Sequence, residues 1–303
     1  MHFADSKNCL SYMVARRWPK GVTCPICGSA SVSFLANQQR WQCSSHHPKR
    51  QFTLKTGTIF EDSPLALDKW LPAVWMISNC KNGVSSWELH RALGVTQKTA
   101  WFMLHRVRLA LQGKDGGMLP GEVQVDETFI GRKARNMHAS KRAVKITGTG
   151  GKDKTVVMGM LERGGEVRAM VVDNRRKGEL QSRVREHVRV GSALFTDELK
   201  SYEGLEYDYQ HAVINHAIEY VKGNVHTNRM ENFWSLFKRG LRGTYISVDP
   251  FHLFRYIDEQ AFRFNYRKDM TDSDRSHLAA SQIVGKRLTY AELTGKIGET
   301  TLN

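Results

Sequence analysis

The chain has 303 residues, of which 41% are hydrophobic and 25% charged, enough apolar sequence for two or three domains with buried cores. It has no apolar run of roughly 18 residues and no secretory signal pattern, so we expect a cytoplasmic protein with no membrane partner. A formal net charge of +15 favours nucleic acid over an anionic membrane surface or a simple role in solubility.

A cysteine cluster marks the first predicted domain, at residues 1–62. A Cys-x-x-Cys pair is followed after 15 residues by a third cysteine in a short extended run. Paired thiols at this spacing, in a chain with too few cysteines for a disulfide framework, predict a zinc ribbon with one structural Zn²⁺. We predict His46 as the fourth ligand because it keeps the regular two-residue gap, and the adjacent His47 is the alternative. The predicted ligands are Cys24, Cys27, Cys43 and His46.

Helical apolar spacing runs from Leu67 to about Leu111 and predicts a three-helix region at residues 63–113. Gly94 stands at a turn and Thr96 is placed to cap the next helix, which indicates a helix-turn-helix motif. An ordinary helical hairpin with a solvated charged face is the alternative, and the overall positive charge favours DNA binding. The side chains predicted to face DNA are Gln97, Lys98, Arg106 and Arg108.

Glycines and a proline between residues 114 and 121 predict a linker, and β-rich runs follow it. Three expected strands, then alternating helix and strand, imply a mixed α/β sheet at residues 118–270, with a C-terminal tail at 271–303. The expected strands are Glu122–Phe129, Thr155–Leu161, Glu166–Val172, Ala193–Thr196 and Tyr209–Ile214, and the expected helices are 177–189, 198–206 and 226–239.

Three acidic residues stand where this predicted fold places functional groups. Asp126 lies within a β-branched strand, where a charge is costly to bury unless it is paired or binds metal. Asp197 ends an apolar strand, and Glu231 lies on a helix with Lys238 two turns further along the same face. Three carboxylates can hold two divalent ions for phosphodiester chemistry, and hard oxygen ligands favour Mg²⁺ or Mn²⁺. Singly, each acid is equally a cap or a surface salt bridge, the interpretation that we give to Glu127, Glu198 and Asp173.

These motifs resemble those of DDE transposases of bacterial insertion sequences, in particular the group with an N-terminal zinc ribbon (the fifteen-ninety-five insertion-sequence family). The likeness spans almost the whole chain, and 33 residues separate Asp197 from Glu231, with a basic residue seven positions after the glutamate. One departure is the histidine at the second zinc knuckle, where the family commonly has cysteine. The residues that carry the likeness are Arg17-Trp18-Pro19, Thr56-Gly57-Thr58-Ile59-Phe60, Val125-Asp126-Glu127, Thr196-Asp197 and the helix with Asn228, Glu231, Trp234, Lys238 and Arg239.

The resemblance implies an RNase-H-like catalytic domain that follows the zinc ribbon and the helix-turn-helix. It also implies two Mg²⁺ ions, cleavage at the ends of the element, and attack of the freed 3′-hydroxyls on target DNA. The implied metal ligands are Asp126, Asp197 and Glu231.

Further residues and partners follow from the same resemblance. Lys238 and Arg239 are implied DNA contacts, and His226 and Asn228 are secondary candidates that would face the scissile phosphate or cap the helix. The expected partner is double-stranded DNA, at the inverted repeats and at the target, in a bacterial, nucleoid-associated assembly of two or more protomers. A DNA-binding regulator derived from a transposase and a structure-specific two-metal nuclease are the alternative functions.

Overall fold

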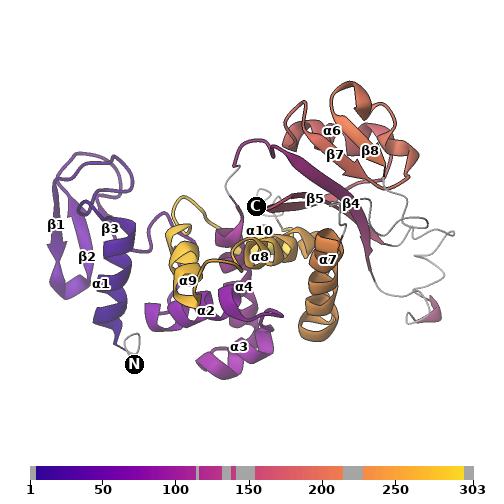
Figure 1. Cartoon of the computed structure of the whole chain (residues 1–303). Helices are drawn as coiled ribbons and strands as arrows, with labels where there is room; N and C mark the ends of the chain where they lie inside the picture. The colour runs from indigo at the N-terminus through magenta and orange to yellow at the C-terminus, as the bar shows by residue number, and fades with distance from the viewer. Residues whose placement is uncertain (1–4, 114–115, 132–137, 141–153, 214–227, 297–303) are drawn as a thin grey trace. The chain divides into compact units, whose positions relative to one another are not determined.

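The chain divides into two compact units (Figure 1). The first unit combines residues 1–112 with residues 269–303, and the second comprises residues 113–268. Every helix among the described residues is too short or too polar to cross a membrane. The computed structural model describes residues 5–113, 116–131, 138–140, 154–213 and 228–296.

The first unit begins with a helix and a small antiparallel sheet. Helix α1 (Ser6–Arg17) precedes three strands in the order β1-β2-β3, which span Val32–Leu35, Arg40–Cys43 and Gln51–Phe52. Trp41 and Phe52 are register partners whose rings stack with centroids 6.0 Å apart, and the ring of Trp18 packs edge-on at 5.5 Å from Trp41. Such a small aromatic core supplies little hydrophobic stabilisation, so a metal would help this module to fold.

Three helices follow in the first unit: α2 (Leu67–Asn79), α3 (Ser86–Leu93) and α4 (Gln97–Leu111). Ser85 and Glu88 form a capping box at the start of α3, and Gly94 ends that helix with φ 65°. Thr96 caps α4 by accepting a hydrogen bond from the Thr99 amide at 3.1 Å. The local turn and cap signals in the sequence therefore lie where these helices begin and end.

The C-terminal segment is part of the first unit, which corrects our expectation of a tail. Helices α9 (Asp272–Ser281) and α10 (Tyr290–Thr294) contact α2 and α4 respectively. Asn79 on α2 donates hydrogen bonds from Nδ2 to the Asp272 carbonyl at 3.1 Å and to Ser276 Oγ at 2.8 Å. The segment packs because it has its own buried apolar residues, Ala279, Ala280, Ile283, Leu288 and Leu293.

The second unit contains a five-stranded mixed sheet in the order β6-β5-β4-β7-β8. Strands β4, β5 and β6 pair antiparallel, whereas β7 and β8 join β4 in parallel. The expected mixed α/β sheet is therefore confirmed. The strands are Glu122–Ile130 (β4), Thr155–Glu162 (β5), Val167–Val172 (β6), Ala193–Thr196 (β7) and Gln210–Val213 (β8).

Each face of this sheet has its own hydrophobic core, because successive side chains of a strand point to opposite faces. On one face, Met158 of β5 packs in a cluster with Leu180 and Val184 of α6 (Lys177–His187). On the other face, the neighbouring Val157 packs with Phe233 of α7 (Asn228–Gly240) and with residues of α8 (Leu253–Asn265). Short 3₁₀ turns occur at Ala36–Gln38, Lys200–Tyr202, Leu205–Tyr207 and Pro250–His252, and a π-helical turn at Leu241–Tyr245.

Candidate functional site

The parallel pairing of β4 and β7 brings two of the predicted carboxylates to neighbouring positions. Gln124 and Phe195 are register partners, and Asp126 and Asp197 each follow this pair by two residues. Adjacent strands lie about 4.8 Å apart, so the two acidic residues lie side by side where β7 ends. Asp197 Oδ1 accepts a hydrogen bond from the Leu199 amide at 3.1 Å, which fixes the turn that follows the strand.

Helix α7 turns a polar stripe toward Asp126. Trp234 Nε1 donates a hydrogen bond to Asp126 Oδ2 at 2.9 Å. Glu231 and Lys238 lie three residues before and four after Trp234, so all three side chains share one side of the helix. Burial lowers the pKa of Lys238, as do Arg242 and Lys154, whereas the charge of Asp126 opposes that shift. Asp126 therefore lies within electrostatic reach of Lys238, and the exposed Glu231 belongs to the same stripe.

A glycine leaves space for the indole that holds Asp126. Gly159 of β5 is the register partner of Asp126, and a Cβ at that position would lie 2.7 Å from Trp234 Cζ2. In the sequence, Trp234 is one of the helix residues that carry the family likeness, and no role is predicted for Gly159. An indole N–H in a buried stripe needs an acceptor, and this was the available signal that Trp234 contacts a polar group.

Glu127 is a fourth acid at this place. Its Oε1 is buried and has no hydrogen-bond partner among the residues that the structure describes. The pKa of Glu127 is raised to about 8, first by burial and then by Asp197 and Asp126, while Arg175 opposes the shift. The interpretation as a surface salt bridge is therefore wrong for Glu127, because its carboxyl is buried and its register partner Met158 lies in the cluster on the α6 side of the sheet. Carboxylate oxygens gathered in this way are the donors that hard divalent cations prefer.

The zinc-ligand cluster contains His47 in place of the expected His46. One ligand atom from each of its four residues lies within 4.8 Å of all the others. Cys27 Sγ and Cys43 Sγ are 3.6 Å apart, and Cys24 Sγ and His47 Nε2 are 3.4 Å apart, close to the edges of about 3.6–3.8 Å of a tetrahedral zinc shell. The four residues are Cys24, Cys27, Cys43 and His47.

A backbone contact explains why His47 can serve as the ligand. Its Nδ1 lies 2.7 Å from the Pro48 carbonyl, so Nδ1 carries the proton that is donated and Nε2 is left as the acceptor. Counting residues between ligands could not reveal this, because the local turn rather than the gap decides which histidine points inward. The cysteine spacing and the gathered ligand atoms together support one structural zinc ion.

Two of the four predicted DNA contacts on α4 are buried. Arg106 is 5% exposed, and it donates to the Glu61 carbonyl at 2.9 Å and to the Leu288 carbonyl at 3.1 Å. Arg108 is 1% exposed. The prediction that these arginines contact DNA is corrected, because the C-terminal segment covers a side of α4 that its amphipathic pattern assigns to solvent.

The other predicted DNA contacts differ in exposure. Gln97 Nε2 donates to Ser86 Oγ at 2.8 Å, and the exposed Lys98 places its Nζ 4.7 Å from the centroid of the Tyr290 ring. Arg239 is exposed and Lys238 half-buried on α7. Asn228 is the first residue of that helix, and His226 lies outside the described residues.

Comparisons with known proteins match both units. The ISXO2-like transposase domain matches residues 118–265, and the transposase zinc-ribbon domain matches residues 4–46. A Halobacterium salinarum protein described as an uncharacterized protein in transposable element ISH50 is 29% identical over 255 residues, which cover 79% of this chain and 84% of the relative. An uncharacterized transposase-like protein of Haemophilus influenzae is 31% identical over 101 residues, which cover 33% of this chain and 81% of the relative.

Proposed function

Because the chain belongs to the family of ISXO2-like transposases with an N-terminal zinc ribbon, we propose that it is the strand-transfer enzyme of an insertion sequence. It would bind the inverted repeats of its element, cut the DNA at their 3′ ends and join these ends to target DNA. The observation that carries this proposal is the hydrogen bond from Trp234 to Asp126, which turns the helix bearing Glu231 and Lys238 toward the acidic strand ends.

The sheet supports an RNase-H-like assignment for the catalytic domain, proposed at residues 118–270. Three antiparallel strands continue into two parallel ones, and helices lie on both faces. The three proposed catalytic acids then come from the central strand, from the end of the neighbouring parallel strand and from a helix. We propose that the zinc ribbon (1–62) and a helix-turn-helix region (63–113) bind the DNA ends, in an assembly of at least two protomers.

The acidic cluster fits divalent cations. Asp126, Asp197 and Glu231 would be their ligands. Burial raises the pKa of Glu127 most, and the charges of Asp197 and Asp126 contribute to the shift, so positive charge would be favourable at this place. Two bound Mg²⁺ or Mn²⁺ ions would stabilise the charge on the attacking and leaving oxygens of a phosphodiester. The donor set contains oxygen alone, as these ions require.

Residues of the chain would position the reacting groups. Trp234 orients the carboxylate of Asp126 through its N–H, the kind of supporting contact that tunes ligand affinity. Lys238 and Arg239, on the last turn of the same helix, would hold the phosphates that flank the scissile bond. A regulator that only bound DNA would gain nothing from an indole fitted against Gly159 to orient a carboxylate.

The test uses purified protein, Mg²⁺, labelled DNA that ends in the inverted repeat flanking the gene, and a supercoiled target. Asp197→Asn is the informative variant because its Oδ1 can still accept from the Leu199 amide, and Asp173→Asn, at an exposed acid, is the matched control. We expect joined product from the intact protein and the control, and end binding without joining from Asp197→Asn.

Three results would contradict the proposal in different ways. Joining by Asp197→Asn at the wild-type rate would remove Asp197 from the catalytic set. Cleavage without joining by the intact protein would indicate a two-metal nuclease. Tight, salt-sensitive binding without cleavage would indicate a regulator.

A further inference from the structure

Helix α4 offers few side chains for reading DNA sequence. Arg106 and Arg108 are buried, and Lys98 lies over the ring of Tyr290, which leaves Gln97 as the one predicted contact on this helix whose amide is available. A recognition helix needs several polar side chains that can reach base edges from its N-terminal part. The first unit must therefore present another polar surface if it distinguishes one DNA sequence from another.

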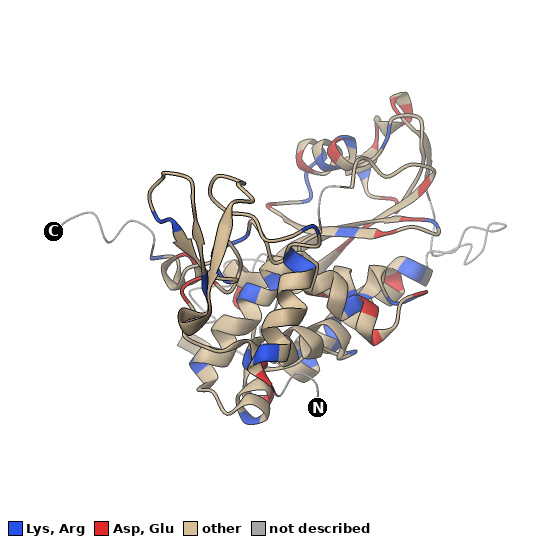
Figure 2. Ribbon diagram, turned by 90° about the vertical axis from the view of Figure 1, so that its left-hand side faces the viewer, with Lys and Arg blue, Asp and Glu red and all other residues tan. Residues whose placement is uncertain are grey.

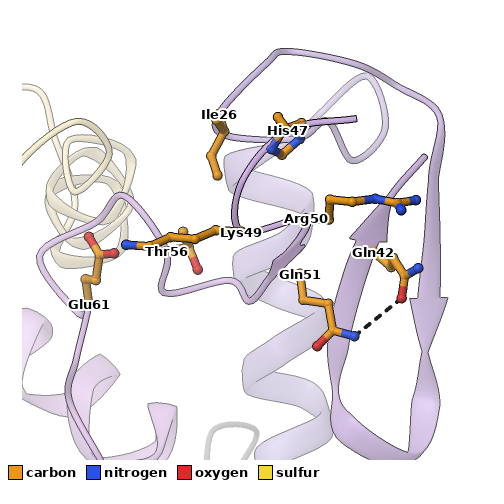
Figure 3. Close-up of a pocket in the computed structure, with 8 residues that line it drawn as sticks. All are labelled: Ile26, Gln42, His47, Lys49, Arg50, Gln51, Thr56 and Glu61. Atoms are coloured by element: carbon orange, nitrogen blue, oxygen red, sulfur yellow. Dashed lines mark hydrogen bonds between the residues drawn. The ribbon is translucent and has the colours of Figure 1, made fainter. Parts of the chain in front are cut away.

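The zinc ribbon has such a surface on the face opposite its aromatic core. Ser33, Gln42 and Gln51 are register partners across the three strands and form one polar row. Gln51 Nε2 donates to Gln42 Oε1 at 3.3 Å, and Arg40 Nη1 donates to Gln51 Oε1 at 3.1 Å. These contacts hold two amides and a guanidinium in a fixed order along β2 and β3, as Figure 3 shows for the two glutamines.

All the lysine, arginine, aspartate and glutamate positions in the segment that contains this row are basic. Residues 6–60 contain eight lysines and arginines and neither aspartate nor glutamate. The exposed Lys49 and Arg50 line, with Gln42 and Gln51, an open groove of about 640 Å³, and Glu61 lies at its far end (Figure 3). Arg50 donates from Nε to the Cys43 carbonyl at 3.0 Å, which anchors its guanidinium beside a zinc ligand. Figure 2 shows that lysines and arginines are also present in the rest of the chain, in both units.

We propose that this face of the zinc ribbon reads base edges in the major groove of double-stranded DNA, and this inference rests on the proposed function. A major groove about 12 Å wide admits a two-stranded β-ribbon, and a glutamine amide can pair with adenine N6 and N7 while arginine pairs with guanine. Gln42, Gln51 and Arg40 supply these groups. Lys49 and Arg50 contact the phosphates beside the groove, which positions the ribbon without reading sequence.

The experiment selects binding sites from duplexes with 20 randomised base pairs (about two helical turns), with the intact chain and with variants. Gln42→Ala/Gln51→Ala removes both amides, and Gln38→Ala removes an exposed glutamine of the preceding 3₁₀ turn as the matched control. Zinc content and circular dichroism establish that each variant folds. Affinities for the selected duplex and for a shuffled duplex are then measured over a range of salt concentrations.

We expect the double glutamine variant to lose at least about tenfold in its preference for the selected duplex, with unchanged affinity for the shuffled one. Lys49→Ala/Arg50→Ala should weaken binding to both duplexes alike and reduce the salt slope by about two. Gln38→Ala should behave as the intact chain.

Two outcomes would overturn the inference and can be told apart. If Gln97→Ala/Lys98→Ala abolishes the preference and the ribbon variant keeps it, the helix reads the sequence and the ribbon does not. If the intact chain selects no duplex sequence at all, sequence-specific end binding fails as well, and the proposed function loses that part.

Discussion

Replacement of Gly159 by alanine tests the packing that holds the carboxylate of Asp126. The new Cβ would lie 2.7 Å from Trp234 Cζ2 and 2.9 Å from Cη2, whereas non-bonded carbons pack at about 3.5–4.0 Å. The indole must retreat by roughly 1 Å, and overpacking of this kind costs about 1–3 kcal/mol. We expect the free energy of unfolding to fall by about 2 kcal/mol. Strand transfer should fall by roughly 10-fold or more, because the contact between Trp234 Nε1 and Asp126 lengthens.

A double-mutant cycle with Trp234→Phe isolates the cause. The smaller ring vacates the space that the alanine methyl needs, so Gly159→Ala should be nearly neutral in that background, with a coupling energy of about 1–2 kcal/mol. Unfolding is followed by circular dichroism in urea, and activity by the joining assay. Equal destabilisation by Gly159→Ala in both backgrounds would refute the argument that the indole occupies this space.

Three further predictions address separate features. Without added divalent cations, and without a chelator that would strip the structural zinc, the intact protein should lose on the order of 3–5 kcal/mol of stability as the pH rises from 4.5 to about 8, because the Glu127 carboxyl ionises first in the unfolded chain. Glu127→Gln should remove that slope, and a persisting slope would contradict the assignment. His47→Ala should lose bound zinc by mass spectrometry while His46→Ala keeps it, and the reverse result would restore His46 as the ligand. Arg106→Ala should lower the free energy of unfolding by about 2 kcal/mol because two backbone carbonyls lose a donor; unchanged stability with weakened DNA binding would return Arg106 to the DNA interface.

Local sequence patterns predicted the elements of the second unit closely. The predicted strand Ala193–Thr196 has the observed bounds, and three others differ by one residue at one end. The predicted strand Tyr209–Ile214 begins one residue before β8, and its predicted end lies outside the described residues. The predicted helix at 198–206 is wrong, because Gly204 adopts φ 100° and divides the segment into two 3₁₀ turns. The spacing of apolar residues and the order of strands and helices along the chain predicted the sheet. The positive φ of one glycine could not be predicted from composition.

Contacts between distant segments account for what the sequence did not reveal. The burial of Arg106 depends on the carbonyl of Leu288, a residue 182 positions away, so the amphipathic pattern of α4 alone assigned that side chain to solvent. The zinc ligand depends likewise on one turn of backbone, which points His47 inward. The neighbouring positions of Asp126 and Asp197 were predictable, because a charge in or at the end of an apolar strand is costly and needs an explanation.

Several features near Asp126 are unfavourable for the stability of the fold when no cation is bound. Glycine weakens a strand interior, and Gly159 lies in the strand paired with β4. The pKa of Glu127 is raised to about 8, first by burial and then by the charges of Asp197 and Asp126. A structural role for one of these residues would not explain why Asp126 lies next to Asp197 and also accepts a hydrogen bond from Trp234. Divalent cations bound near these acids would offset the repulsion, and the space left by Gly159 admits the indole that donates to Asp126.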